Sequence, residues 1–436
     1  AGAPEMLFFP IFQPEGDFIV QQASDVAGLE GITMMAADGL LNTNYMAIAE
    51  TEGMYFSGPD IRYGSNTNQS TGQTADGFLA AYNDEWGEDP AAPFWAHSYD
   101  ATTLLLDAIA AASYDDGGTL VIDRAGVREY LAGVTDYSGI IGLMSCDAFG
   151  DCGSQKITVI GHTDSGDIAA SNANVIYEYA PGGSSIVGAA LGGVPFHLGD
   201  GSLGTVEVGS GEDIQIRSLN AISGDVAFLG IPNQRGVEMA IADYGSIGGH
   251  DVSMGTGLDD LCSADGGQAA AQTIVADEQV VGVIGTSCSG AAAAAAPLIS
   301  EANMVMISGS NTSPSLTSDL AGTAGSNNYP GYYRTAHNDL YQGAAAANFA
   351  VDVLGVSTAA AIHDGDPYTQ GLAQAFADAF EGHGGTITTF TAVNKGDTDM
   401  IPVLTEIAAG APELLFFPIF QPEGDFIVQQ ARDVPG

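Results

Sequence analysis

Apolar runs alternate with helical patterns of hydrophobic residues through the second half of the chain. IQIRSLNAI, DVSMGTGL, VVGVIG and MVMISG have the pattern of strands, and helices are expected near residues 234–243, near 269–274 and from Ala291 onward. Parallel strands need a long crossover connection, so helices between strands are typical of a parallel, doubly wound sheet. The pattern therefore predicts an α/β fold.

A second series of strands and helices follows the first. TAAAIHD, TITTFTAV and LLFFPIF are its expected strands, with a helix over residues 370–380 and another before LLFFPIF. Earlier in the numbering, ITMMAADG and GMYFSGP continue the scheme, AHSYDATTLLLDAIAAAS is a long helix, and ITVIGH and NVIYEYAP resemble antiparallel strands. The series is long enough for two sheets, and 436 residues favour two domains. Residues 181–202 are glycine-rich without a clear period, which predicts a connector.

The two ends of the chain carry the same segment. Residues 1–28 and 409–436 differ only at the pairs Met6/Leu414, Ser24/Arg432 and Ala27/Pro435. The sequence has no third copy, so this is not a repeat array. Each copy reads as one strand, a turn and one helix, which cannot bury its faces alone. We therefore expect one place in the fold that either copy could fill, with room for only one copy in each molecule.

This duplication leads to two expectations about the whole chain. The order 203–436 followed by 29–180 would make the chain a circular permutation, with the segment at the cut present on both sides. An undocked copy would expose an apolar strand. We therefore expect one copy to complete its own lobe and the other to dock onto another chain, giving a segment-exchanged homo-oligomer.

The charge of the chain argues against two kinds of partner. Lys and Arg number 9 against 54 Asp and Glu, a formal net charge of −45. Nucleic acids and anionic membranes are polyanions, so neither is expected to bind. The acidic residues are spread along the chain, which indicates a solvated surface. No apolar stretch reaches the roughly 20 residues of a membrane span, and we recognise no signal peptide, so a mature or trimmed form is expected.

Four cysteines are present: Cys146, Cys152, Cys262 and Cys288. They form no CxxC pair and have no histidine at zinc-ligand spacing, so we expect neither a metal nor a cofactor. An even number suits two disulfides in an oxidising compartment. Cys146 and Cys152 flank the polar loop DAFGD, which a local bridge could close. Cys262 and Cys288 each follow a strand-like run, and adjacent parallel strands would bring such positions together.

Nine motifs stand in one order when the chain is read from residue 203 to 436 and then from 29 to 180. They are AISGDVAFLGIPNQRGVEMAIAD, GTSCSGAAAAAAPLI, ISGSNTSPSLT, YYRTAHNDLYQG, HDGDPYTQGLAQAF, FFPIFQPEGDFIVQQAR, AADGL, SGPDIRY and FWAHSYDATTLLLDAI. In this order the chain resembles the periplasmic leucine/isoleucine/valine-binding protein family, the type I solute-binding proteins of ABC transporters. The resemblance also implies the Cys262–Cys288 disulfide, whereas Cys146–Cys152 rests on spacing alone.

The resemblance implies two doubly wound, parallel-sheet lobes joined by a hinge of three crossings, with the ligand in the cleft between them. The native N-terminal lobe would comprise residues 203–335 and 63–131. The native C-terminal lobe would comprise residues 338–436, 1–57 and 134–180. The crossings would fall near residues 335–337, 57–60 and 131–134.

Two loops could hold the α-carboxylate of a ligand. TSCSG follows an expected strand and leads into a helix, so the free N–H groups near Ser289 and Gly290 make an anion cradle. SGSNTSPSLT follows the next strand and brings Ser310 and Thr312 to the same edge. The resemblance implies a ligand role for Ser289 and Thr312, although these side chains could also be ordinary helix caps.

The resemblance implies the opposite side of the site as well. Asp38 in AADGL matches the acidic ligand residue of the family, and Tyr368 in DPYTQG matches its ring-bearing loop. They would bind an ammonium group by a charge-assisted hydrogen bond and a cation–π contact. Alternatively, Asp38 is a turn residue and Tyr368 a surface aromatic. Where the family often has a tyrosine, this chain has Phe420, or Phe12 in the other copy, which leaves the side-chain specificity open.

Further residues could wall the side-chain pocket or belong to the core: Phe228, Leu229 and Trp95. A catalytic interpretation is also conceivable on position, because Cys288 lies between a strand and a helix and His363 could serve as its base. GTSCSG is not GxSxG, however, and Cys288 has an expected disulfide partner. We therefore expect no enzymatic activity.

The expected function is capture of a small zwitterionic ligand, an aliphatic branched-chain amino acid, for the membrane permease of an ABC transporter. Its location would be periplasmic or extracellular, after secretion or with a lipid anchor in the native form. The alternative is a ligand-sensing receptor domain, or an engineered or assembling switch, built on the same fold.

Overall fold

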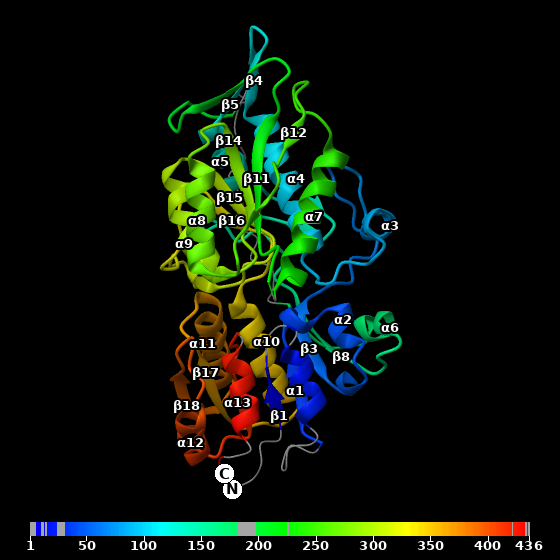
Figure 1. Cartoon of the computed structure of the whole chain (residues 1–436), viewed down its shortest axis with the longest axis vertical. Coiled ribbons are helices and arrows are strands. Elements are labelled where there is room, and N and C mark those ends of the chain that lie inside the picture. Colours follow the sequence, from blue (N-terminus) through cyan, green and yellow to red (C-terminus); the bar gives the residue numbers. More distant parts are fainter. Residues whose placement is uncertain are drawn as a thin grey trace.

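The computed structural model describes residues 6–9, 13, 15–23, 31–180, 198–224, 226–420, 422–431 and 434. Two lobes follow one another along the long axis of the molecule, and each has one large sheet with helices on both faces (Figure 1). The molecule therefore has the two-lobed α/β fold that the sequence predicts. Most of the predicted connector, residues 181–197, lies outside the described residues.

The large sheet of the first lobe is parallel, with the strand order β12-β11-β14-β15-β16 and β13 also paired to β11. Its strands are β11 (Ile214–Asn220), β12 (Val252–Ser253), β13 (Leu258–Asp259), β14 (Val280–Gly285), β15 (Val305–Ser308) and β16 (Tyr332–Arg334). The predicted strand VVGVIG is β14, and every one of its residues is buried, as expected for the centre of a covered parallel sheet.

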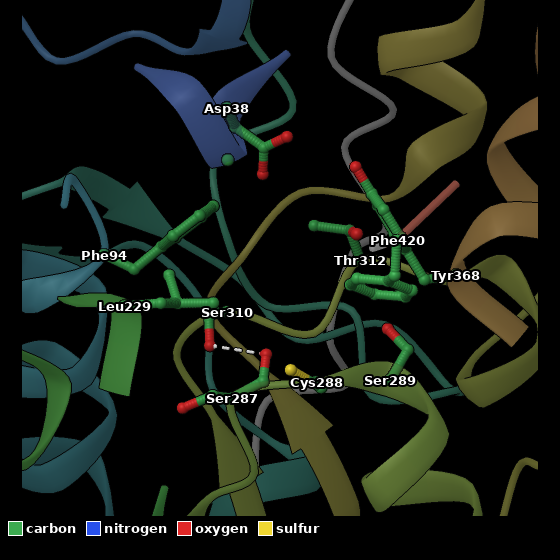
Figure 2. A pocket seen from close by; sticks show the side chains of 11 residues that line it. Asp38, Phe94, Leu229, Ser287, Cys288, Ser289, Ser310, Thr312, Tyr368 and Phe420 are labelled. Carbon is green, nitrogen blue, oxygen red and sulfur yellow. Dashed lines mark hydrogen bonds between the residues drawn. The ribbon is translucent and has the colours of Figure 1, made fainter. Parts of the chain in front are cut away.

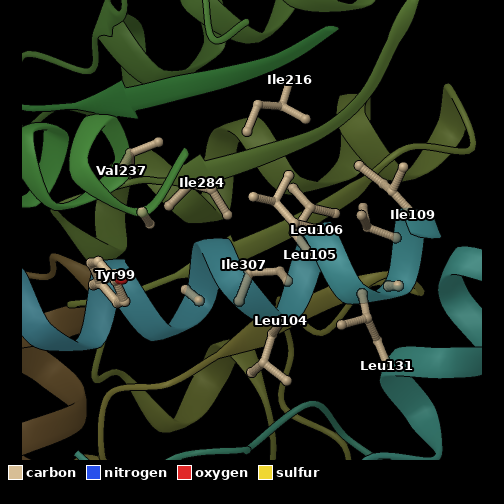
Figure 3. Close-up of a cluster of buried hydrophobic side chains, with 14 of the residues drawn as sticks. Tyr99, Leu104, Leu105, Leu106, Ile109, Leu131, Ile216, Val237, Ile284 and Ile307 are labelled. Atoms are coloured by element: carbon tan, nitrogen blue, oxygen red, sulfur yellow. The ribbon is translucent and has the colours of Figure 1, made fainter. Parts of the chain in front are cut away.

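Helices bury both faces of this sheet. The helices that cover it are α4 (Trp95–Ala111) and α7 (Ala227–Tyr244) on one face, and α8 (Ala264–Val275) and α9 (Ser289–Glu301) on the other. Helix α4 is the predicted long helix, and its leucines pack against Ile284 and Ile307 of the sheet (Figure 3). Because α7 covers its outer side, α4 is buried along nearly its whole length.

Smaller elements complete the first lobe. An antiparallel sheet has the order β10-β5-β4, and β6 and β7 form a hairpin. The bounds of these elements are β4 (Ser113–Asp116), β5 (Thr119–Asp123), β6 (Tyr137–Gly139), β7 (Gly142–Met144), β10 (Thr205–Val208), α3 (Ala75–Trp86), α5 (Arg124–Ala132) and η3 (Pro314–Leu316).

The second lobe is built on an eight-stranded sheet with the order β18-β17-β19-β1-β2-β3-β8-β9. Its strands are β1 (Met6–Phe8), β2 (Thr33–Ala36), β3 (Tyr55–Pro59), β8 (Ile157–Gly161), β9 (Val175–Tyr179), β17 (Thr358–His363), β18 (Thr386–Ala392) and β19 (Leu414–Phe416). The strands from β18 to β3 are parallel, whereas β8 and β9 are antiparallel. The antiparallel pattern predicted for ITVIGH and NVIYEYAP is confirmed.

Helices cover both faces of the second sheet too. One face packs against α10 (Asp339–Asp352) and α11 (Pro367–Gly382), and the other against α1 (Glu15–Ala23), α12 (Ile401–Ala409) and α13 (Glu423–Ala431). Short helices lie near its far edge and its loops: η1 (Asp38–Leu40), α2 (Thr43–Met46), η2 (Ala49–Thr51) and α6 (Ile168–Ala173).

Both copies of the duplicated segment lie in this one sheet. Strands β1 and β19 are parallel neighbours and pair copy to copy, Met6 with Leu414 and Phe8 with Phe416. β19 also pairs with β17, and β1 with β2. The expectation that one molecule has room for only one copy, and that the other docks onto another chain, is therefore wrong. An added parallel strand can pair its backbone groups on both sides, so the sheet accommodates it.

Three of the segments that pass between the lobes lie wholly within the described residues and correspond to the predicted crossings, and one of them differs from the prediction. β16 leads into α10 through residues 335–338, and β3 leaves the second lobe through residues 60–62. The third crossing lies at residues 153–156 and not at 131–134. Residues 137–152 stay in the first lobe, because Tyr137 and Met144 are buried in the same core as α4. Assigning residues 134–152 to the second lobe is therefore wrong.

Backbone contacts explain why this segment stays in the first lobe. The N–H of Cys152 donates to the carbonyl of Arg334 and the N–H of Arg334 to the carbonyl of Gly150, both at 2.9 Å. A Cβ on Gly153 would collide with the carbonyl oxygen of Thr335, so glycine is what allows two crossings to run this close together. The permuted chain order itself stays a prediction.

Candidate functional site

Loops at the ends of strands from both lobes surround one pocket. The pocket is lined by Asp38, Gly39, Phe94, Leu229, Ser287, Cys288, Ser289, Ser310, Thr312, Tyr368 and Phe420. The serines lie on one side and Asp38 on the opposite side, while Phe94 and Leu229 face Tyr368 and Phe420 across the space between them (Figure 2). The site thus has a hydroxyl side, an acidic side and apolar walls.

The hydroxyl side is built where β14 and β15 end. Helix α9 begins at Ser289, and the preceding residue, Cys288, gives its first turn no side-chain cap. The first N–H groups of a helix have no partner within the helix, and the helix dipole favours an anion there. The Ser310 hydroxyl is held in place because it donates to the carbonyl of Ser287 and accepts from Asn233 Nδ2, both at 3.1 Å.

Asp38 forms the acidic side of the pocket. It begins η1 directly after β2, and 6 % of its surface is exposed. Gln342 Nε2 donates to Asp38 Oδ1 at 3.0 Å, and Gln342 Oε1 lies 2.8 Å from His337 Nε2. Burial lowers the pKa of His337, so this ring is neutral at pH 7. In the part of the chain that the structure describes, Asp38 has no ion-pair partner.

A second acid lies behind the hydroxyl side. Asp339, the first residue of α10, is wholly buried, and its N–H donates to the carbonyl of Thr312 at 2.9 Å. Burial and the charge of Asp38 raise the pKa of the Asp339 carboxyl well above its ordinary value. Asp339 thus lies next to Thr312 and outside the lining, whereas Asp38 is the acid that lines the pocket.

Aromatic and aliphatic side chains enclose the remaining space. The rings of Tyr368 and Phe420 lie 5.6 Å apart, and Phe94 and Leu229 belong to one buried cluster. The pocket has a free volume of about 20 Å³, room for roughly one water molecule. An amino acid is larger than this, so a ligand of that size needs movement of the side chains or of the lobes to enter.

The structure brings together most of the ligand-site residues predicted from the sequence. Those that line the pocket are Asp38, Leu229, Ser289, Ser310, Thr312, Tyr368 and Phe420. Gly290 is the second residue of α9 and faces the Asp366 carboxylate of the second lobe. Phe228 packs against the cluster around Phe94 without lining the pocket.

Two other predicted positions fall elsewhere. Phe12 lies outside the described residues. Trp95 is in the core of the first lobe, where its ring stacks on Phe78 with centroids 4.2 Å apart.

Sequence reasoning missed Phe94, Gln342 and Asp339. Each lies inside a motif that carried the family resemblance, FWAHSYD or YYRTAHNDLYQG. The motifs thus pointed to the right segments. Gln342 and Asp339 do not line the pocket themselves, however: Gln342 contacts Asp38, and Asp339 contacts Thr312. These contacts depend on the path of residues 335–338 between β16 and α10, and the spacing of residues along the sequence does not show that path.

Both predicted disulfides are present. Cys262 pairs with Cys288 and Cys146 with Cys152, with Cα atoms 5.1 and 3.8 Å apart. The Cys288 sulfur is therefore bonded and is not a thiolate nucleophile. His363, the base considered for it, ends β17 and accepts a hydrogen bond from the N–H of Gly365 at 3.1 Å.

Within the described ranges of the chain, no group of three or more His, Cys, Asp or Glu side chains is placed to hold a metal ion. No helix in these ranges has the length and apolar character needed to cross a membrane.

Comparison with known proteins identifies the class to which this fold and site belong. The sequence profile of a family described as Periplasmic binding protein matches residues 213–434, about half of the chain. The chain belongs to this family.

Individual relatives agree over the same region. An amino acid binding protein of Pseudomonas aeruginosa is 28 % identical over 224 residues, which are 51 % of this chain and 58 % of that protein. A Leu/Ile/Val/Thr-binding protein of Salmonella typhimurium is 28 % identical over 223 residues, covering 51 % of this chain and 59 % of the relative. The chain thus spans somewhat more than half the length of the curated relatives it matches.

Among solved structures, a leucine binding protein from Thermotoga maritima is similar, with a TM-score of 0.44 and 25 % sequence identity. The alignment covers 50 % of this chain and 60 % of that one.

Proposed function

We propose that this protein is an extracytoplasmic solute-binding protein that captures a small zwitterionic ligand, an aliphatic branched-chain amino acid. The observation that carries the proposal is the pocket in which the start of α9 and the Ser310 hydroxyl face the Asp38 carboxylate. A zwitterion has one anionic and one cationic end, and this pocket offers a partner for each. The relatives named for amino acids support the same ligand class.

Each part of the ligand has a proposed partner. The α-carboxylate would accept hydrogen bonds from the first N–H groups of α9 and from the hydroxyls of Ser289 and Thr312. The ammonium would donate to Asp38, with the Tyr368 ring beside it. An aliphatic side chain would pack between Phe94, Leu229 and Phe420, which are the apolar members of the lining.

The remaining parts of the proposal concern transport. Opening of the lobes would admit the ligand, and closure would present it to the permease of an ABC transporter. A periplasmic or extracellular location fits the family and the two disulfides, which persist in oxidising compartments. The solute-binding relatives do not favour the alternative of a receptor domain or switch.

Titration calorimetry with three matched ligands tests this proposal. L-leucine carries both charges, 3-methylbutylamine lacks the carboxylate, and 4-methylpentanoate lacks the amine. Saturable binding of leucine with much weaker binding of the other two is expected, because each lacks a partner for one end of the site. Equal affinity for the three compounds, or no binding of leucine, isoleucine and valine, would contradict the proposal.

A further inference from the structure

The duplicated strands are equivalent in their surroundings as well as in sequence. On one face of the sheet Met6, Phe8, Leu414 and Phe416 share one buried cluster, and on the other face Leu7, Phe9, Leu415 and Phe417 share another. The rings of Phe8 and Phe416 stack with centroids 4.6 Å apart. Each residue of β1 thus points to the same side of the sheet as its counterpart in β19.

The hydrogen-bond register allows one copy to replace the other. Met6, Leu7 and Phe8 pair with Thr33, Met34 and Met35 of β2, and they pair with their own counterparts in β19. If β19 moved next to β2 without a shift along the strand, Leu414 would face Thr33 and Phe416 would face Met35. Every side chain would stay on its present face, which a slip by one residue would not allow.

The helices that follow the two strands are equivalent too. Helices α1 and α13 have the same sequence, EGDFIVQQA, and both pack on the same face of the sheet. Ile19 and Val20 of α1 and Ile427 and Val428 of α13 are buried in one cluster. The strand and its helix can therefore be replaced as a unit.

The inserted strand also changes the spacing of the candidate site. Tyr368 follows β17, Phe420 follows β19 and Asp38 follows β2, in the strand order β17-β19-β1-β2. β1 is the one strand in this row that separates Phe420 from Asp38. Neighbouring strands lie about 4.8 Å apart, so β1 widens the floor of the site by about that distance.

We propose that β1 is a replaceable spacer strand. It holds Asp38 one strand farther from Tyr368 and Phe420 than a sheet without β1 would. When β1 cannot pair, β19 pairs with β2 in its place. The width of the ligand site is therefore set by how many copies the sheet contains.

Proline substitutions in the full-length chain test this proposal, because proline lacks the N–H that a central strand needs. Leu7→Pro disables the first copy, and Leu415→Pro is its matched counterpart in the second. Ala360→Pro in β17 is the control, since this buried central strand has no duplicate among the described residues. Both single-copy variants are expected to keep a cooperative thermal transition, whereas Ala360→Pro is expected to lose it.

A distance measurement gives the second readout and needs no ligand. Spin labels on Asn44→Cys and Thr386→Cys, both exposed, lie on the two sides of the duplicated strands. The distance between the labels is expected to shorten by about 4.8 Å in Leu7→Pro and in Leu415→Pro. An unchanged distance would overturn the proposal, and so would the loss of the thermal transition in Leu7→Pro to the same extent as in Ala360→Pro.

Discussion

At the scale of single residues, Asp38 is the proposed partner of the ligand's ammonium group. The substitution Asp38→Asn removes the charge and keeps the size of the side chain. We expect leucine affinity to fall by about 2 to 5 kcal/mol, since the ammonium would lose its charged partner. The free energy of unfolding should change little by comparison, because no cation inside the described protein depends on Asp38.

Calorimetry and urea unfolding measure these two quantities. The exposed Asp76→Asn in α3 is a control of equal charge change, and it should leave affinity unaltered. An unchanged dissociation constant in Asp38→Asn would mean that Asp38 is only a turn residue.

His97 provides a prediction about pH. Burial, with a contribution from His337, lowers the pKa of His97 to about 3. Between this pKa and the ordinary value of about 6.5, the unfolded chain binds a proton that the folded protein does not. His97 therefore destabilises the fold as pH falls through this window, by up to about 1.4 kcal/mol per pH unit.

Comparing the wild type with His97→Gln isolates this effect from the buried carboxyls of Asp100 and Asp260. Burial raises the pKa of those carboxyls, and they act in the opposite direction. The variant should lose less stability than the wild type when unfolding is measured from pH 6.5 down to pH 4. Parallel curves for the two proteins would show that His97 does not titrate in this way.

At the scale of elements, the two disulfides should differ in their effect on stability. Cys262 and Cys288 are 26 residues apart in sequence, whereas Cys146 and Cys152 are 6 apart. A longer closed loop restricts the unfolded chain more, so replacing the first pair by alanine should cost about 3.5 kcal/mol and replacing the second about 2 kcal/mol. Urea unfolding under non-reducing conditions measures both; the reverse ranking would contradict this.

Many of the helices and strands could be predicted from the sequence, because a buried parallel strand is a nearly continuous run of apolar residues. VVGVIG and TAAAIHD are short apolar runs bounded by turn residues, and both became central strands. The antiparallel strands β8 and β9 were also recognisable: β8 is a short apolar run that is wholly buried, and the residues of β9 alternate between half-buried and exposed. The hydroxyl and acidic sides of the pocket followed from loops at strand ends together with the family resemblance.

What failed depends on long-range packing. Residues 137–152 have short strands and turns without a period, so nothing local shows that Tyr137 and Met144 pack against α4. The coexistence of β1 and β19 was also missed. Their nearly identical sequences show that both copies fit one kind of position. They do not show how many strands the sheet can hold, because that depends on the strands that pair on either side.

At the scale of the whole molecule, the net charge of −45 is the dominant feature. Like charges on a folded surface repel one another, and dissolved salt screens this repulsion over about 8 Å at 0.15 M and 3 Å at 1 M. We expect the melting temperature to rise by a few degrees between these two concentrations of sodium chloride. A neutral osmolyte at equal osmolality is the control, and an equal rise in both solutions would rule out screening as the cause.

The position of β1 and β19 has a consequence for the order of events during synthesis. β1 leaves the ribosome early and can pair with β2 soon afterwards, whereas β19 emerges hundreds of residues later. The two strands nevertheless meet at the middle of the sheet. Until the last part of the chain appears, each half of the sheet ends in an unpaired apolar edge. Pairing of β1 with β19 therefore has to wait for the second copy, and we expect the unpaired edges to favour association between newly made chains until then.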